Sequence, residues 1–340
     1  MPNERFYVIP TIDAEGVHGA QPFENFAIGE IGAEEDWGSF KIARIFREFG
    51  VTGTFFVDVY EHSLFGEAPV ARLCEGLAKL GQDVQLHTHP SWRDDPRDHQ
   101  ALRDLKRQRS YMAQSHDFMA KLSVAQQVDV LGHGIDCLKK WIGIAPVIHR
   151  SGGYSINADT ISALRQVGMT ADSSMNVSHG NSRLTWSRNQ IVEQDGILEL
   201  PVTVARISAG VPGIPLYKRL IKTDINALED RHLRQFCIQG ARNDLVFLNY
   251  FMHSYSLLDY APDFTNIRPS QRLEQQMRQF LGWAVEQPWI KVTDCKALLD
   301  VLRQPGFDRG GTDFVPEIKD TPLIMKKGFR KLTGQLAQTH

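Results

Sequence analysis

The chain has few cysteines and no long apolar run. Its four cysteines lie far apart in the 340-residue sequence and form no Cys-x-x-Cys pair, which favours unpaired thiols over a disulfide framework or a zinc knuckle. No segment approaches the roughly 20 consecutive apolar residues that a transmembrane helix needs. The first residues also lack the apolar core of a secretory signal. We therefore expect a cytoplasmic protein in a reducing compartment.

Excess charge of either sign is also missing. The 38 Lys and Arg residues nearly balance the 40 Asp and Glu residues, for a formal net charge of -2. Such a balance offers no electrostatic basis for binding nucleic acid or an anionic membrane surface. The hydrophobic fraction of 42% is that of an ordinary globular protein. We therefore expect a globular protein without a nucleic-acid partner.

Short apolar runs alternate with amphipathic helical patterns along most of the chain. Arg5–Ile12 is predicted to be a strand, residues 34–49 carry apolar side chains at helical spacing, and Thr52–Val59 is predicted to be the next strand. This alternation is typical of βα units around a parallel sheet, and it predicts an α/β fold.

Two regions depart from the alternation. Residues 184–207 are β-rich and contain a hairpin turn at Gln194-Asp195-Gly196, so we expect an insertion laid against the main sheet. Residues 306–340 are predicted to form a peripheral C-terminal tail. Residues 1–305, with the β-rich insertion among them, are predicted to form one domain.

Five of the predicted strands end in polar side chains that can act in catalysis or bind a metal. The C-terminal ends of parallel strands in an α/β barrel meet at one mouth, where catalytic groups gather. We therefore expect a single site that contains Asp13, His87, His89, Arg150, Asp172 and His253.

Three side chains within this set indicate metal binding. His87 and His89 stand at i and i+2, so on an extended backbone their rings point the same way. With Glu15 they supply the nitrogen and oxygen donors that zinc accepts, and a position is left for water. Each motif alone is more typical of a solvated turn or a surface histidine, and the remaining histidines are expected on the surface or on helices. Together the motifs favour a divalent metal site, with zinc as the expected ion.

The order and spacing of the motifs resemble those of the NodB-like polysaccharide deacetylases of carbohydrate esterase family 4. The segment Ile42–Val57 is similar to the helix and strand that separate the family's first two motifs. The resemblance covers about residues 5 to 302 and implies a distorted (β/α) barrel. The five motifs correspond here to Thr11–Glu15, His87–Pro90, Arg150–Tyr154, Asp172–Ser174 and Met252–Ser254.

The resemblance implies roles for the residues that would bind metal and activate water. Asp13 would be the general base, oriented and kept ionised by Arg150. Glu15, His87 and His89 would bind the metal. The family usually spaces its two metal histidines at i and i+4, so here either both histidines bind or only His89 does.

The resemblance also implies roles on the leaving-group side. His253 would be the general acid, and Asp172 would fix its ring and favour its protonated form. The backbone of Gly152-Gly153-Tyr154 would bind the oxyanion. Trp37 and Trp92 lie near predicted mouth loops, where they could stack on a sugar or simply pack in the core.

The combined prediction is a metal-dependent hydrolase that removes an N-acyl group, most simply N-acetyl, from a carbohydrate. A cytoplasmic location favours a nucleotide-linked or lipid-linked sugar precursor, as in bacterial surface-polysaccharide or O-antigen assembly. One alternative is hydrolysis or transfer of another acyl or imidoyl group on a sugar amine. Another is a sugar-binding protein that has the fold without catalysis.

Overall fold

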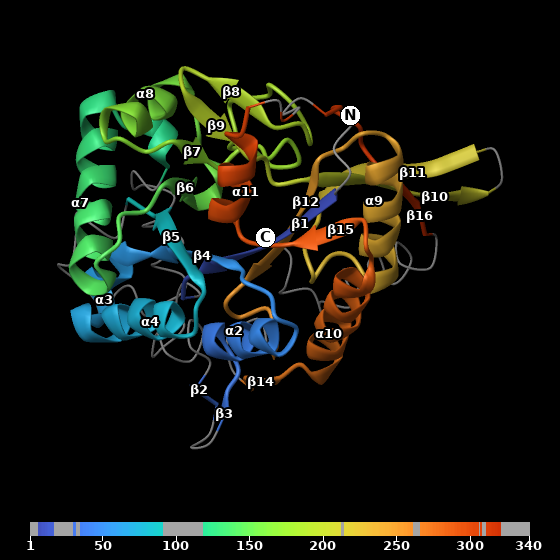
Figure 1. Ribbon diagram of the computed structural model, residues 1–340, viewed down its shortest axis with the longest axis horizontal. Helices are drawn as coiled ribbons and strands as arrows, with labels where there is room; N and C mark the ends of the chain where they lie inside the picture. The colour runs from blue at the N-terminus through green and yellow to red at the C-terminus, as the bar shows by residue number, and fades with distance from the viewer. Residues whose placement is uncertain are drawn as a thin grey trace.

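The computed structural model describes most of the chain, and Figure 1 shows how its elements are arranged. The described residues are 6–16, 30–31, 35–90, 118–211, 214–260, 266–305, 307 and 311–320.

A nine-stranded sheet forms the centre of the structure. Eight strands follow the order β12-β1-β4-β5-β6-β7-β9-β8, and β15 also pairs with β1. Every pair is parallel except β8 with β9. The sheet curls into an open half-barrel (Figure 1), so the predicted α/β class is confirmed. The strands are β1 (Phe6–Ala14), β4 (Thr54–Asp58), β5 (Asp83–Thr88), β6 (Ile148–Ser151), β7 (Ala171–Asp172), β8 (Val192–Gln194), β9 (Ile197–Glu199), β12 (Phe247–His253) and β15 (Ile290–Val292).

Helices cover the outside of this sheet, and one helix closes its inner side. Ser123 and Asn157 begin α7 and α8 through capping boxes, as their sequence positions predict. The helix predicted over residues 34–49 is shorter, because Glu35–Asp36 forms a strand instead. The helices are α2 (Ser39–Glu48), α3 (His62–Phe65), α4 (Glu67–Lys79), α7 (Val124–Ile142), α8 (Ala158–Gln166), α9 (Asp230–Arg242), α10 (Gln271–Glu286) and α11 (Cys295–Leu302). In the described ranges, short 3-10 turns are η1 (Val59–Glu61), η3 (Met119–Lys121) and η4 (Gly152–Tyr154).

Strand alternation divides the buried side chains between the two faces of the sheet. Ile12 and Val57 belong to the large core beneath the outer helices. On the inner face, Tyr7 and Phe56 pack with the leucines of α11 in a second core, at the end of the half-barrel where the strands begin. The inner face is therefore filled at one end. At the other end, where the parallel strands end, the same face carries polar side chains.

A second sheet lies beside the half-barrel. It consists of β11 (Ile214–Lys222), β10 (Val204–Val211) and β16 (Glu317–Lys319) in that order. β16 lies in the segment predicted to be a peripheral tail. That prediction is wrong for residues 311–320, because Ile318 is fully buried against β10.

The β-rich segment predicted over residues 184–207 does contain a hairpin, formed by β8 and β9. Asp195 and Gly196 both have positive φ values, 52° and 81°, as the two central residues of a type I′ turn require. β9 pairs with β7, so the hairpin extends the main sheet rather than lying against it. Two further pairs of short strands are β2 (Glu30–Ile31) with β3 (Glu35–Asp36) and β13 (Leu258–Asp259) with β14 (Arg268–Pro269).

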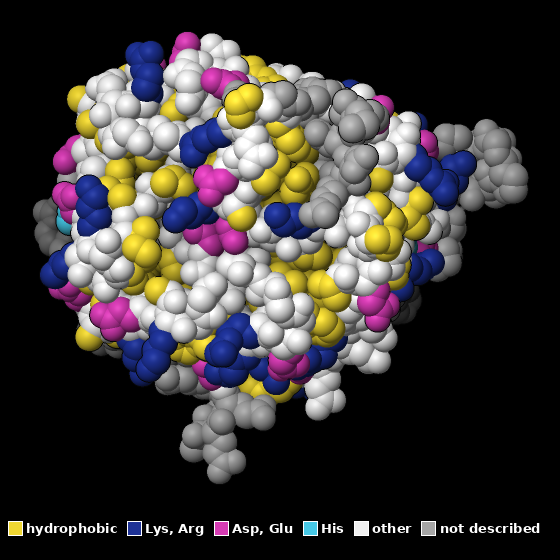
Figure 2. Space-filling model, in the orientation of Figure 1, with side chains coloured by type: hydrophobic (Ala, Val, Ile, Leu, Met, Phe, Trp, Pro, Cys, Tyr) yellow, Lys and Arg dark blue, Asp and Glu magenta, His cyan; other side chains and the backbone are white. Residues whose placement is uncertain are grey.

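The surface and the thiols agree with the composition. In Figure 2 basic and acidic side chains alternate over the visible face without a large patch of one sign. All four cysteines are free thiols, as predicted. None of the helices in the described ranges combines the length and apolarity needed to cross a membrane.

Candidate active site

Parallel pairing aligns the ends of five neighbouring strands at one edge of the sheet. The register sets Asp13 of β1 beside His253 of β12, Asp58 of β4 beside His87 of β5, and His87 beside Arg150 of β6. Alternation along each strand turns these side chains to the inner face, above Phe56. The polar residues at the strand ends therefore meet at the mouth of the half-barrel.

Glu15, His87 and His89 form the centre of this group. Oε2 of Glu15 lies 3.1 Å from Nε2 of His87 and 3.0 Å from Nε2 of His89. Nδ1 of His87 is 2.8 Å from the carbonyl oxygen of Arg150, which can only accept, so Nδ1 carries a proton and Nε2, which faces Glu15, is the ring nitrogen that a metal would use. Two donor atoms that share a tetrahedral zinc lie about 3.3 Å apart. The distances from Glu15 to both histidines are therefore close to those between two ligands of one zinc ion.

Two further carboxylates are buried next to Glu15. Glu61 accepts a hydrogen bond of 2.7 Å from the N–H of Gly16, and Asp58 accepts one of 3.1 Å from the N–H of Tyr60. Among the described residues, the second oxygen of each carboxylate is buried without a hydrogen-bond partner. Burial, followed by the neighbouring carboxylates, raises the pKa of Glu61 well above its usual range. Burial likewise raises the pKa of Asp58 to about 6.

The donor set and its charge fit a divalent cation. Burial alone would raise the pKa of Glu15, but hydrogen bonds to His87 and His89 outweigh it and hold that pKa well below its usual range. A carboxylate without a partner is costly to bury, and a cation nearby removes that cost. The unpartnered oxygens of Asp58 and Glu61 therefore point to a positive charge beside Glu15, in agreement with the predicted metal site.

Arg150 contacts Asp13, as the resemblance implies. Its Nη1 donates to Oδ1 of Asp13 at 2.8 Å, and its other nitrogens donate to the backbone oxygen and hydroxyl of Ser173. The guanidinium is fully buried and stacks on the Phe56 ring at 4.1 Å. A guanidinium held from several sides keeps Asp13 in one orientation.

His253 faces the same centre from β12. Its Nε2 lies 3.7 Å from Oε1 of Glu15, and its ring stacks on Tyr255 with centroids 4.8 Å apart. Burial lowers the pKa of His253, the positive charge of Lys222 adds to this effect, and Glu15 and Asp13 act against it. His253 is therefore placed to exchange a proton at the mouth, and it is a stronger acid than a solvated histidine when protonated.

The predicted contact between Asp172 and His253 is wrong. Oδ1 of Asp172 lies 2.8 Å from Nδ1 of His149, and Oδ2 accepts from the N–H of Ser174 at 2.7 Å. β7 pairs with β6, which carries His149, whereas β12 lies on the far side of β1, β4 and β5. Asp172 and His149 are both fully buried, so this pair supports the strand end of β6 from within.

The turn after β6 contains the residues predicted to bind an oxyanion. A Cβ at Gly152 would lie 2.5 Å from the His89 ring, so the absence of a side chain there lets His89 approach. Gly153 and Tyr154 both have positive φ, 56° and 58°, which is uncommon for an aromatic residue. The hydroxyl of Tyr154 accepts from Nζ of Lys222 at 3.0 Å.

Lys222 is a member of the site that the sequence did not indicate. It lies at the end of β11, its Nζ is 3.1 Å from Oδ2 of Asp224 and 3.9 Å from the centroid of the Phe251 ring. Burial acts to lower the pKa of Lys222, but Tyr154 and Asp224 outweigh it and raise that pKa. Lys222 thus adds a fixed positive charge close to His253.

Trp37, one of the two tryptophans expected near the mouth, is buried instead. Trp37 is only 7% exposed and packs in the large core, with the ammonium of Lys41 4.3 Å from its ring centroid. Core packing, the alternative raised by the sequence, therefore accounts for Trp37. Trp92 lies outside the described residues.

Comparison with known proteins gives a fold but no family. No family model and no curated protein matches the chain. Among solved structures, a Mycobacterium smegmatis protein assigned as a polysaccharide deacetylase matches with a TM-score of 0.54 and 17% identity, over 93% of this chain and 96% of that one. A 4-alpha-glucanotransferase from Thermococcus litoralis matches with a TM-score of 0.50 and 10% identity, over 87% of this chain and 40% of that one.

A carbohydrate esterase family 4 pseudoenzyme from Bacillus anthracis also matches, with a TM-score of 0.43 and 13% identity over 94% of this chain and 71% of that one. At 17% identity the likeness to the Mycobacterium smegmatis protein shows a shared fold and no more. The fold of this chain is therefore similar to that of the Mycobacterium smegmatis protein over nearly its whole length.

Proposed function

We propose that this chain is a metal-dependent hydrolase that removes an N-acyl group, most simply N-acetyl, from a carbohydrate. The observation that carries the proposal is the convergence of Glu15, His87 and His89 beside the Asp13–Arg150 pair. The first three supply metal donors, and the pair supplies a positioned base. A pure binding protein has no need of a buried arginine that orients a carboxylate at the mouth.

The residues divide the reaction between them. A zinc ion held by Glu15, His87 and His89 would polarise the amide carbonyl and lower the pKa of water. Asp13 would take the proton from the attacking water, held in place by Arg150. His253 would give a proton to the departing amine from the opposite side. The backbone N–H groups of the η4 turn remain our candidates for binding the oxyanion.

The substrate class rests on two further observations. The Mycobacterium smegmatis protein of similar fold is assigned as a polysaccharide deacetylase, which favours a sugar amide here. The four free thiols suit a reducing compartment, and so a nucleotide-linked or lipid-linked precursor of a surface polysaccharide such as O-antigen. Both the precursor and the cytoplasmic location are part of the proposal.

The test is a panel of sugar amides incubated with the purified protein, with release of the acid measured. The panel contains N-acetyl, N-formyl and N-acetimidoyl sugars, so that it also tests the alternative acyl and imidoyl reactions. We expect acetate release that a chelator abolishes and zinc restores. Asp13→Asn should lower the turnover number by about 10²–10⁴-fold while sugar binding survives. Sugar binding with no acid released from any member would favour the non-catalytic alternative.

A further inference from the structure

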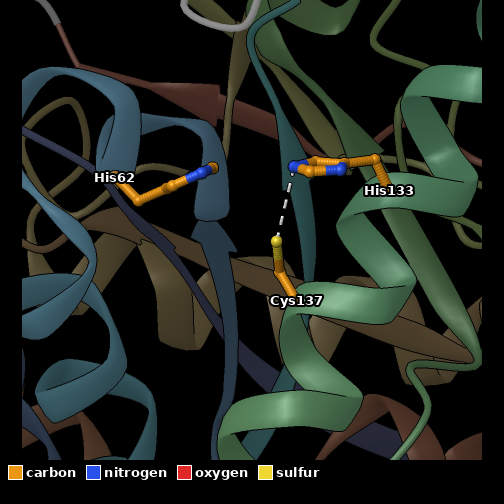
Figure 3. A group of neighbouring side chains, drawn as sticks. All are labelled: His62, His133 and Cys137. Atoms are coloured by element: carbon orange, nitrogen blue, oxygen red, sulfur yellow. Dashed lines mark hydrogen bonds between the residues drawn. The ribbon is translucent and has the colours of Figure 1, made fainter.

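A second cluster of metal-binding side chains lies on the outer side of the structure. It contains His62 at the start of α3 and His133 and Cys137 on α7. His62 and Cys137 are partly exposed and His133 is exposed. Figure 3 shows the His62 ring pointing across from its own segment toward α7, and His133 and Cys137 standing one turn apart on that helix. Residues four apart on a helix share one face, so two donors already point the same way.

The separations within this cluster match those around a zinc ion. Sγ of Cys137 lies 3.6 Å from Nε2 of His133. A nitrogen and a sulfur that share a tetrahedral zinc are about 3.5 Å apart. One donor atom from each of the three residues lies within 4.8 Å of the others, so a small rotation of the exposed His133 ring would close the set.

The proton on His62 is placed as it is in metal-binding histidines. Nδ1 of His62 is 2.7 Å from the carbonyl oxygen of Val59, and a carbonyl can only accept, so Nδ1 carries the proton. Nε2 therefore has its lone pair available. Histidine ligands almost always donate their other N–H to a carbonyl or carboxylate in this way, which fixes the ring for the metal.

A third group of potential metal ligands shows the contrast. Glu229, His232 and Asp320 also lie close together. Nδ1 of His232 accepts from the N–H of Glu229, so Nε2 must be the donor toward Asp320 at 2.7 Å. Both ring nitrogens of His232 are hydrogen-bonded within the protein, so this ring has no lone pair left to bind a cation.

We propose that His62, His133 and Cys137 bind a borderline-soft divalent cation, Zn²⁺ in the first place, at a site separate from the candidate active site. Thiolate and imidazole donors select this class of metal over Mg²⁺ and Ca²⁺, which prefer oxygen.

The metal at this site would join the η1 turn, which lies next to the candidate active site, to α7. His62 directly follows η1, whose Glu61 lies beside Glu15 in the candidate active site. The hydroxyl of Tyr60 in the same turn already donates to the carbonyl oxygen of Val130 on α7. A bound cation would fasten this turn to α7 at a second point. The proposal does not depend on the proposed hydrolase activity.

The test is a titration of the full-length protein with Co²⁺ in a thiol-free reductant. Cobalt bound to a thiolate gives a charge-transfer band in the near ultraviolet, which the nitrogen and oxygen donors of the active site cannot give. We expect the band in the wild type and in Glu15→Gln, which alters only the other site, and its bleaching by Zn²⁺. Cys137→Ser should remove it. Asp136→Asn, an exposed change on the same helix, is the matched control and should keep it.

Equilibrium dialysis against Zn²⁺ gives a second measure. Cys137→Ser should bind one ion fewer per chain than the wild type and retain its far-ultraviolet circular dichroism. A wild type with no thiolate band at saturating Co²⁺ would overturn the proposal. So would a band that persists in Cys137→Ser, since the thiolate would then come from another cysteine.

Discussion

Asp58 should make the metal-free protein less stable as the pH rises. Its carboxyl group is fully buried, with one oxygen bonded to the N–H of Tyr60 and the other without a partner. Burial, helped by the charge of Glu15, raises the pKa of Asp58 from 3.8 to about 6, although His89 and His87 act against it. A folded-state pKa above the unfolded value means that folding favours the protonated form. The stabilisation is complete below the unfolded pKa and is lost as the pH rises through the folded pKa.

The size of the effect follows from the shift. A change from 3.8 to about 6 is about two pK units, and each unit corresponds to 1.36 kcal/mol. The metal-free protein should therefore lose about 3 kcal/mol of unfolding free energy through this group between about pH 4 and pH 7. Asp58→Asn keeps the shape and removes the titration. A buried amide without hydrogen-bond partners lowers the stability of the variant at every pH. The two proteins are therefore compared by how much their unfolding free energy changes with pH, and not by its absolute value.

The assay is urea unfolding at several pH values in the presence of a chelator. The wild type should lose more stability than Asp58→Asn as the pH rises, and Asp136→Asn, which removes an exposed carboxylate, should follow the wild type. Added Zn²⁺ should reduce the loss in the wild type, because the cation supplies the missing counter-charge. Parallel curves for the wild type and Asp58→Asn under chelation would refute the reasoning.

Other predictions concern the neighbours of this carboxylate. Arg150→Met breaks a buried ion pair and should cost about 3–5 kcal/mol in urea unfolding, and less when combined with Asp13→Asn; equal costs in both backgrounds would contradict a direct pairing. Lys222→Met should raise the pKa of His253, so the high-pH limb of kcat/KM, where the general acid loses its proton, should move to higher pH. A limb at the wild-type pH would mean that His253 is not the general acid. His87→Ala should lower zinc affinity in equilibrium dialysis, and unchanged affinity would leave His89 as the sole histidine ligand.

Local pattern was enough to predict the residues at the strand ends. Each of Asp13, His87, Arg150 and His253 directly ends or nearly ends a short apolar run, and parallel strands bring such ends together whatever their order. The meeting of Glu15 with both histidines follows from the same alternation. The charged centre of the site could therefore be found without knowledge of the sheet order.

Contacts that depend on sheet order or on a second layer could not be found in this way. Asp172 bonds to His149 because β7 is next to β6, and nothing in the local sequence states that order. Lys222 lies on β11, in a sheet whose third strand comes from the segment at Glu317–Lys319, so its approach to Tyr154 is a long-range contact. The sequence did not indicate Asp58 as part of the site, although it ends a correctly predicted strand. Only its complete burial distinguishes it from a solvated turn residue.

The close spacing of the metal histidines is linked to a residue on another strand. His87 is the second-last residue of β5 and His89 directly follows the strand, so an extended backbone turns both rings to the inner face. The His89 ring then lies where a side chain at position 152 would be, with a Cβ there only 2.5 Å away. The i and i+2 pair and Gly152 therefore belong together, and the glycine makes room for the His89 ring whether or not its backbone also binds an oxyanion.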